Sequence, residues 1–109
     1  DPSTILGLRD RAILETLYAT GIRRSELIRL DLSHLELNRG VASIRHGKGD
    51  KDRFVPIGER ATAWIRKYLL EARPKLMTYG DERAVFLSVR GDRINNHYLT
   101  ELVAKAIEE

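Results

Sequence analysis

The sequence has no cysteine and no long apolar run. A disulfide framework and a thiolate metal site are therefore excluded. No segment approaches the roughly 20 apolar residues that a helix needs to cross a bilayer. The first residues, Asp-Pro-Ser-Thr, lack the basic start and apolar stretch of a secretory signal. These absences exclude disulfide-stabilised scaffolds and favour a cytoplasmic protein.

Charge of either sign is also not in large excess. The net charge is +3 over 109 residues, with a pI near 9.4, so composition alone does not establish a polyanionic partner. The distribution of charge is more informative. Between residues 45 and 53 lie four basic side chains and His46, opposed only by Asp50 and Asp52. Leu, Ile, Val and Phe are frequent enough for the chain to build a modest core.

Two helices are predicted in the first third of the chain. Apolar residues recur at helical spacing over residues 7–19, and they put Tyr18 on the apolar face and Arg9 on the polar face. Gly21 is expected to end this helix, because glycine readily adopts the left-handed conformation of a helix stop. A short second helix follows over residues 25–30.

The middle of the chain predicts a β-hairpin. Residues 41–45 and 54–57 are strand-like, and residues 38–40 read as a turn. Pro56 indicates an edge strand, since proline cannot donate to a ladder. Residues 85–87 are a candidate for a short third strand.

Two further helices complete the predicted elements. The clearer one covers residues 59–73, with Trp64 and Tyr68 in the core, and Pro74 is expected to stop it. Asn95 can cap the last helix. The buried stripe of that helix is predicted to contain Leu99, Leu102, Val103, Ala106 and Ile107. The expected fold class is α+β, mainly helical, with a small antiparallel sheet.

Arg23 and Lys48 are the side chains best suited to chemistry. Arg23 follows the Gly21 turn, and its guanidinium offers a rigid fork of donors that matches two phosphate oxygens. Glu26, one helical turn on, can orient Arg23 or a nearby histidine, although such a pair is more often an ordinary helix ion pair. Lys48 lies between two glycines, where it can donate a proton to a leaving alkoxide, or simply form a solvated hairpin tip.

Other candidate sites are weaker. The pattern of a nucleotide-binding P-loop fails at Ala42 and Gly49. The histidines fit no metal motif, and His34 and His97 are expected at the surface or in caps. The tyrosines invite interpretation as nucleophiles, but Tyr18 and Tyr68 are better explained by core packing.

Taken together, the motifs resemble the catalytic domain of tyrosine recombinases, the phage integrase family, with the bacterial Xer branch closest. The similarity begins in residues 8–14 and is most specific in Thr-Gly-Ile-Arg-Arg-Ser-Glu-Leu at 20–27 and Gly-Lys-Gly-Asp-Lys-Asp-Arg at 47–53. It continues through residues 54–57, 85–88 and 93–95. The order and spacing of the two central motifs carry the assignment.

The resemblance implies a role for several residues. Arg23 would be the first catalytic arginine, Lys48 the catalytic lysine and Glu26 an accessory acid. The family cleaves and rejoins DNA through a 3′-phosphotyrosyl link, without ATP or a metal cofactor. The expected partner is double-stranded DNA, on which four copies of the full-length protein would assemble. DNA contacts are expected from Arg45, His46, Lys51, Arg53, Arg93 and Asn95.

The family pattern also has parts that this sequence does not contain. A His-x-x-Arg cluster and the nucleophilic tyrosine should follow the last helix, and an N-terminal DNA-clamping domain is typical. Residues 1–109 are therefore expected to be the N-terminal portion of a catalytic domain, inactive alone. Two alternatives stay open: a helix-turn-helix regulator with its recognition helix at residues 24–30, and a small interaction module with a basic loop.

Overall fold

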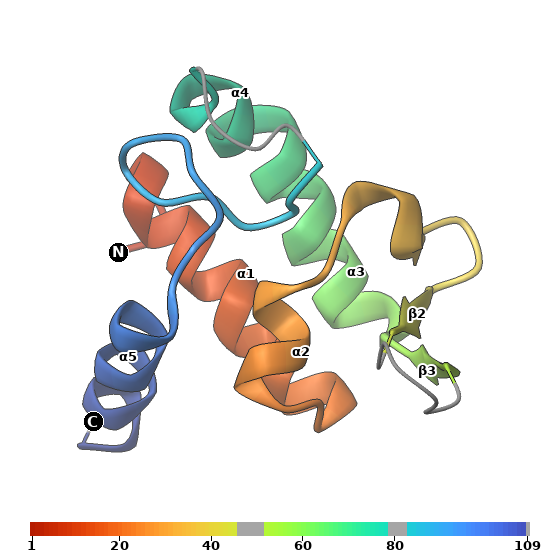
Figure 1. The fold of residues 1–109 in the computed structure, drawn as a ribbon. Helices are drawn as coiled ribbons and strands as arrows, with labels where there is room; N and C mark the ends of the chain where they lie inside the picture. The colour runs from red at the N-terminus through yellow and green to blue at the C-terminus, as the bar shows by residue number, and fades with distance from the viewer. Residues whose placement is uncertain (46–51, 79–82, 109) are drawn as a thin grey trace.

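The fold was determined as a computed structural model, which describes residues 1–45, 52–78 and 83–108 (Figure 1). The elements follow the chain in the order α1 (Ile5–Thr20), α2 (Arg24–Ile28), η1 (Leu32–His34), β1 (Leu35–Glu36), β2 (Val41–Ile44), β3 (Arg53–Pro56), α3 (Gly58–Lys67), η2 (Tyr68–Ala72), α4 (Arg73–Leu76) and α5 (Asn96–Glu108). The predicted class, mainly helical with a small antiparallel sheet, is confirmed. Within these residues no helix is both long and apolar enough to span a membrane.

Helix α1 begins two residues before the predicted residue 7, and the hydroxyl of Thr4 accepts from the Gly7 amide at this start. Local signals set the end of α1 and the start of α5 as predicted. Gly21 ends α1 with φ at 68°. Asn95 caps α5, since its side-chain oxygen accepts from the Tyr98 amide at 2.9 Å. Each signal involves residues only a few positions apart, which explains why the sequence revealed them.

The sheet is antiparallel, with the strand order β1-β2-β3. Pro56 pairs with Val41 at the end of β3, an edge strand as predicted. The expected third strand at residues 85–87 is wrong, because the third strand is Leu35–Glu36. Residues 84–87 are fully buried and form only isolated bridges, through Ala84 and Leu87.

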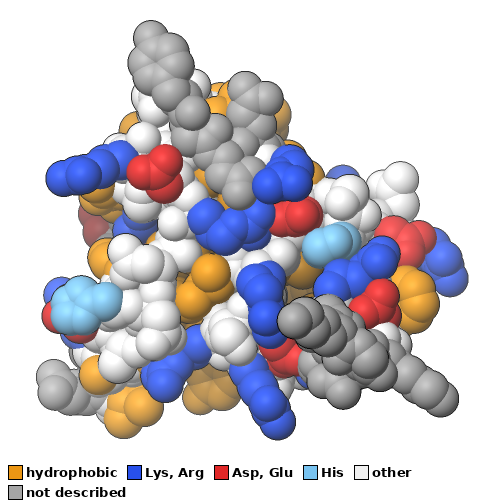
Figure 2. All heavy atoms as spheres, viewed as in Figure 1, with side chains coloured by type: hydrophobic (Ala, Val, Ile, Leu, Met, Phe, Trp, Pro, Cys, Tyr) orange, Lys and Arg blue, Asp and Glu red, His pale blue; other side chains and the backbone are white. Residues whose placement is uncertain are grey.

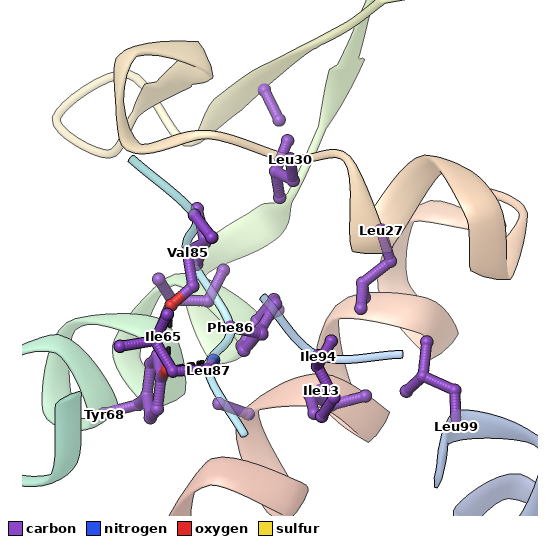
Figure 3. Close-up of a cluster of buried hydrophobic side chains, with 14 of the residues drawn as sticks. Ile13, Leu27, Leu30, Ile65, Tyr68, Val85, Phe86, Leu87, Ile94 and Leu99 are labelled. Carbon is purple, nitrogen blue, oxygen red and sulfur yellow. Dashed lines mark hydrogen bonds between the residues drawn. The ribbon is translucent and has the colours of Figure 1, made fainter. Parts of the chain in front are cut away.

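Side chains supplement the few backbone hydrogen bonds of this buried segment, which join Val85 to Leu30 and Phe86 to Ile94. The Tyr68 hydroxyl donates to the Val85 carbonyl at 2.7 Å and accepts from the Leu87 amide at 3.1 Å (Figure 3). The Arg73 guanidinium donates twice to the Ala84 carbonyl. The backbone of the segment is thus satisfied at the centre of the core, where unpaired polar groups would be costly.

Pro74 does not stop the helix as expected, because helical structure continues to Leu76. The residues before it, Tyr68–Ala72, form a π-helical turn, and Pro74 lies in the first turn of α4. The missing proline N–H is tolerated there, since first-turn amides have no partner within the helix. The prediction assumed one uninterrupted α-helix.

Three assignments of side chains to core or surface were wrong. Tyr18, predicted in the core, is 93% exposed, because the buried face of α1 runs through Leu8, Ala12, Ile13 and Thr16. Arg9, predicted on the polar face, is 1% exposed. Of the predicted stripe on α5 only Leu99 is buried, and Ile107 is 78% exposed. Tyr68 is buried as predicted, whereas Trp64 is half-buried.

Arg9 is buried because its guanidinium has partners throughout. It donates to the Leu87 carbonyl at 3.1 Å and to the Asp10 carboxylate, and it lies over the Tyr98 ring at 4.6 Å. The Tyr98 hydroxyl in turn donates to Asp10 at 2.7 Å. This cluster attaches α5 to α1 and to the buried segment 84–87.

Candidate active site

Arg23 lies immediately before α2, in the N-cap position, with an extended backbone. The left-handed Gly21 reverses the chain, and buried Ile22 and Leu27 anchor the turn in the core. The Arg23 side chain is exposed. A packed turn therefore presents a permanently charged guanidinium to solvent, an arrangement suited to holding an anion.

Glu26 joins α2 to the sheet. Its Oε1 accepts from the Arg23 backbone N–H at 2.8 Å. The two terminal nitrogens of Arg53, on β3, donate to the same carboxylate, at 2.8 Å to Oε2 and 3.1 Å to Oε1. The Glu26 side chain is 2% exposed. One buried carboxylate therefore fixes the backbone of Arg23 and the base of the hairpin together.

The hairpin carries the other predicted cations. Arg45 follows β2, is exposed, and pairs with Asp52 at 3.2 Å across the base of the hairpin. Lys48, His46 and Lys51 lie outside the described residues. The described residues on either side of them, Arg45 and Asp52, adjoin the paired residues Ile44 and Arg53, and Arg53 contacts Glu26.

Arg93 lies at the other end of α2, and Asn95 follows it two positions later, at the start of α5. Arg93 donates to the carbonyl of Ile28 at 2.7 Å and to Asp31 at 2.6 Å. Asn95 is exposed and caps α5. In Figure 1, α2 lies between α5 on one side and β2 and β3 on the other. The predicted site residues in the described part of the chain thus flank one short helix.

The face that contains α2 is cationic. Figure 2 shows Lys and Arg side chains spread across it, with fewer acidic groups among them. Beside the start of α5 a cavity of about 500 Å³ is lined in part by Arg9, Arg90, Arg93, Ser88 and Asn95. Charge and shape together make this face suitable for a polyanion.

The pairing of Glu26 with Arg53 was missed in the sequence. The sequence favoured Glu26 as a partner of Arg23 or of a histidine, and Arg53 as a DNA contact. No periodicity links two residues that are 27 positions apart. The feature of the sequence that could have indicated this pairing is Arg53 itself, which ends the glycine-rich motif and is the first residue of β3.

The helix-turn-helix alternative gains no support from this geometry. The element that would read bases, α2, covers only Arg24–Ile28. Glu26 and Leu27 are both buried in the fold. Too little of the helix is left for insertion into a DNA groove.

The fold and the site together define a mainly helical domain with an arginine at a helix start and a cationic hairpin beside it. Comparison of the sequence with protein families shows to which class the domain belongs. The chain belongs to the phage integrase family, which matches it over residues 2–109. The resemblance predicted from the motifs is thereby confirmed.

Individual relatives are Xer recombinases. The chain is 47% identical over 108 residues to tyrosine recombinase XerC 2 of Ralstonia nicotianae, covering 99% of this chain and 31% of that protein. It is 45% identical over 103 residues to XerD of Lacticaseibacillus casei, covering 94% and 33%. The chain therefore spans about a third of the length of these relatives.

Solved structures share the fold. The crystal structure of XerA recombinase matches with a TM-score of 0.80 and 31% identity, over 90% of this chain and 34% of that one. XerH recombinase bound to its difH substrate, in a pre-cleavage complex, matches with a TM-score of 0.77 and 23% identity, over 96% and 30%. At this identity the second likeness concerns the fold alone.

Proposed function

We propose that the protein containing this chain is a site-specific DNA recombinase, which cleaves and rejoins DNA through a 3′-phosphotyrosyl intermediate. The observation that supports this best is the Glu26 carboxylate, which holds the backbone of Arg23 and the base of the Lys48 hairpin together. We further propose that residues 1–109 are part of the catalytic domain, and that Arg23 and Lys48 act in it.

The proposed chemistry assigns the two cations to different oxygens. When the tyrosine hydroxyl attacks the phosphorus, negative charge builds on the non-bridging oxygens, and Arg23 would stabilise it there. The bond to the 5′ oxygen breaks, and Lys48 would protonate that leaving oxygen. The phosphodiester becomes a phosphotyrosyl ester, so its bond energy is retained for rejoining.

Double-stranded DNA is the proposed partner. The cationic face around α2 and the membership of the phage integrase family support this choice. Arg45, His46, Lys51, Arg93 and Asn95 would contact DNA, mostly at phosphates, which position the protein without reading sequence. We also propose that four copies of the full-length protein assemble on DNA, in the cytoplasm.

A bridging 5′-sulfur substrate tests the two roles in the full-length protein. A thiolate leaves without a proton, so Lys48→Ala should be slow on normal DNA and largely rescued on the sulfur substrate. Arg23→Ala should be slow on both substrates, because the charge on the non-bridging oxygens is unchanged. Cleavage is measured as covalent adduct on a nicked suicide substrate.

Tyr18→Phe is the control, since this residue is exposed and no part in the chemistry is proposed for it. It should leave adduct formation unchanged. Equal responses of Lys48→Ala and Arg23→Ala to the sulfur substitution would show that the general-acid role of Lys48 is wrong. A wild-type protein that forms no adduct on any target DNA would contradict the recombinase assignment itself.

A further inference from the structure

We propose that Arg53 is a positioning residue of the active site and does not act as a phosphate ligand. Through Glu26 it fixes β3 relative to the turn that carries Arg23. The inference rests on the proposed recombinase function and replaces the DNA-binding role that the sequence suggested for Arg53.

The geometry of the contact is that of a rigid clamp. Both terminal nitrogens of Arg53 face the two oxygens of one carboxylate, at 2.8 and 3.1 Å. Such paired hydrogen bonds fix orientation as well as distance, which a lysine cannot do. Glu26 also accepts from the backbone of Arg23 at 2.8 Å, so any displacement of β3 is transmitted to the catalytic turn.

Burial makes this contact difficult to exchange for a phosphate. The Glu26 side chain is 2% exposed, whereas that of Arg53 is 43% exposed. If Arg53 moved to DNA, a buried carboxylate would lose two charge-assisted hydrogen bonds, which is unfavourable. The same hydrogen bonds raise the pKa of Arg53 above its ordinary value. Arg53 is therefore expected to stay on Glu26 when DNA binds.

Arg45 provides a matched comparison at the other end of the same hairpin. Its side chain is 55% exposed, and its partner Asp52 is 43% exposed, at 3.2 Å. Ion pairs between exposed groups contribute little, because water screens both charges. Arg45 also donates through Nε to the Ser43 hydroxyl at 3.0 Å, which leaves its ion pair with Asp52 separate. Arg45 can therefore exchange Asp52 for a phosphate at smaller cost than Arg53 can exchange the buried Glu26.

The experiment uses the full-length protein with Arg53→Ala, Arg53→Lys, Glu26→Gln and Arg45→Ala. Two quantities are measured for each: the salt dependence of DNA affinity, and the rate of adduct formation at saturating DNA. Arg45→Ala should reduce the salt slope by about one unit, because one phosphate contact is lost. Arg53→Ala should leave the salt slope at the wild-type value and lower the saturated rate on the order of 10–100-fold.

Arg53→Lys keeps the charge, so it tests geometry without removing the cation. We expect its saturated rate to stay at least tenfold below wild type, because lysine does not reproduce the paired contact. Combining Arg53→Ala with Glu26→Gln should slow cleavage no further than either change alone, since both break one contact. That non-additivity distinguishes a shared positioning role from two independent structural defects.

Three results would overturn the inference. One is a salt slope that falls by about one unit in Arg53→Ala. Another is full recovery of the rate in Arg53→Lys, which would make charge sufficient. The third is additive losses in the double variant. The wild-type adduct is measured first, and its absence would contradict the proposed function rather than the role of Arg53.

Discussion

The chain contains two buried clusters of polar contacts, here called junctions, and they connect different parts of the fold. At the first, Glu26 joins the Arg23 backbone to Arg53 on β3. At the second, Tyr68 and Arg73 satisfy the backbone of segment 84–87. The first links two elements that carry exposed cations, whereas the second supplies hydrogen-bond partners to the backbone of a segment inside the core. We therefore expect damage to the first to affect catalysis and damage to the second to affect stability.

The largest effect expected at the first junction is that of Arg23→Ala in the full-length protein. The rate of adduct formation should fall on the order of 10²–10³-fold, because a preorganised donor to the charged phosphate is lost. Arg23→Lys should recover little, since it lacks the planar fork. The exposed side chain makes little contribution to packing, so the thermal midpoint should not change. A clear loss of thermal stability would contradict the view that the first junction affects catalysis and not stability.

The largest effect expected at the second junction is that of Tyr68→Phe. The ring keeps its stacking on Phe86, with 5.2 Å between centroids, but the Val85 carbonyl and Leu87 amide lose the hydroxyl. Two buried backbone groups without a partner should lower the free energy of unfolding by about 1–3 kcal/mol. Urea unfolding of the chain measures this.

Tyr18→Phe is the matched control for that measurement, because Tyr18 is 93% exposed. It should shift the free energy of unfolding by less than about 0.5 kcal/mol. If both variants were equally stable, the hydroxyl of Tyr68 would not be supporting segment 84–87.

A pH dependence is also expected at the second junction. Burial raises the pKa of Tyr68 to about 12, from an ordinary value of 10.0. In the unfolded chain the tyrosine loses its proton first, so its stabilising effect is complete below pH 10.0 and is lost as pH rises to about 12. The loss of one proton can lower the free energy of unfolding by at most about 1.4 kcal/mol per pH unit.

Urea midpoints at pH 9, 10 and 11 would check this, with Tyr68→Phe showing a shallower decline. Some decline should remain, because burial also raises the pKa of Tyr98, and its hydrogen bond to Asp10 adds to this. A variant whose midpoint declines as steeply as wild type would place the alkaline transition elsewhere in the protein.

The sequence by itself determined the features that depend on neighbours along the chain. The Gly21 stop, the Asn95 cap and the edge position of Pro56 were all predicted, and all are present. Each follows from the conformational or hydrogen-bonding limits of one residue type. The two motifs likewise identified the family before any fold was known, because residue order and spacing are properties of the chain.

Only the tertiary structure decided which polar groups would be buried together. Arg9 contacts the Leu87 carbonyl across 78 positions, and Arg53 contacts Glu26 across 27. Periodicity assigned Arg9 to water and Tyr18 to the core, and both assignments were reversed by packing. A charged or aromatic side chain can lie in either environment. Its location depends on whether distant elements supply a hydrogen-bond partner or a surface to cover it, which no local pattern records.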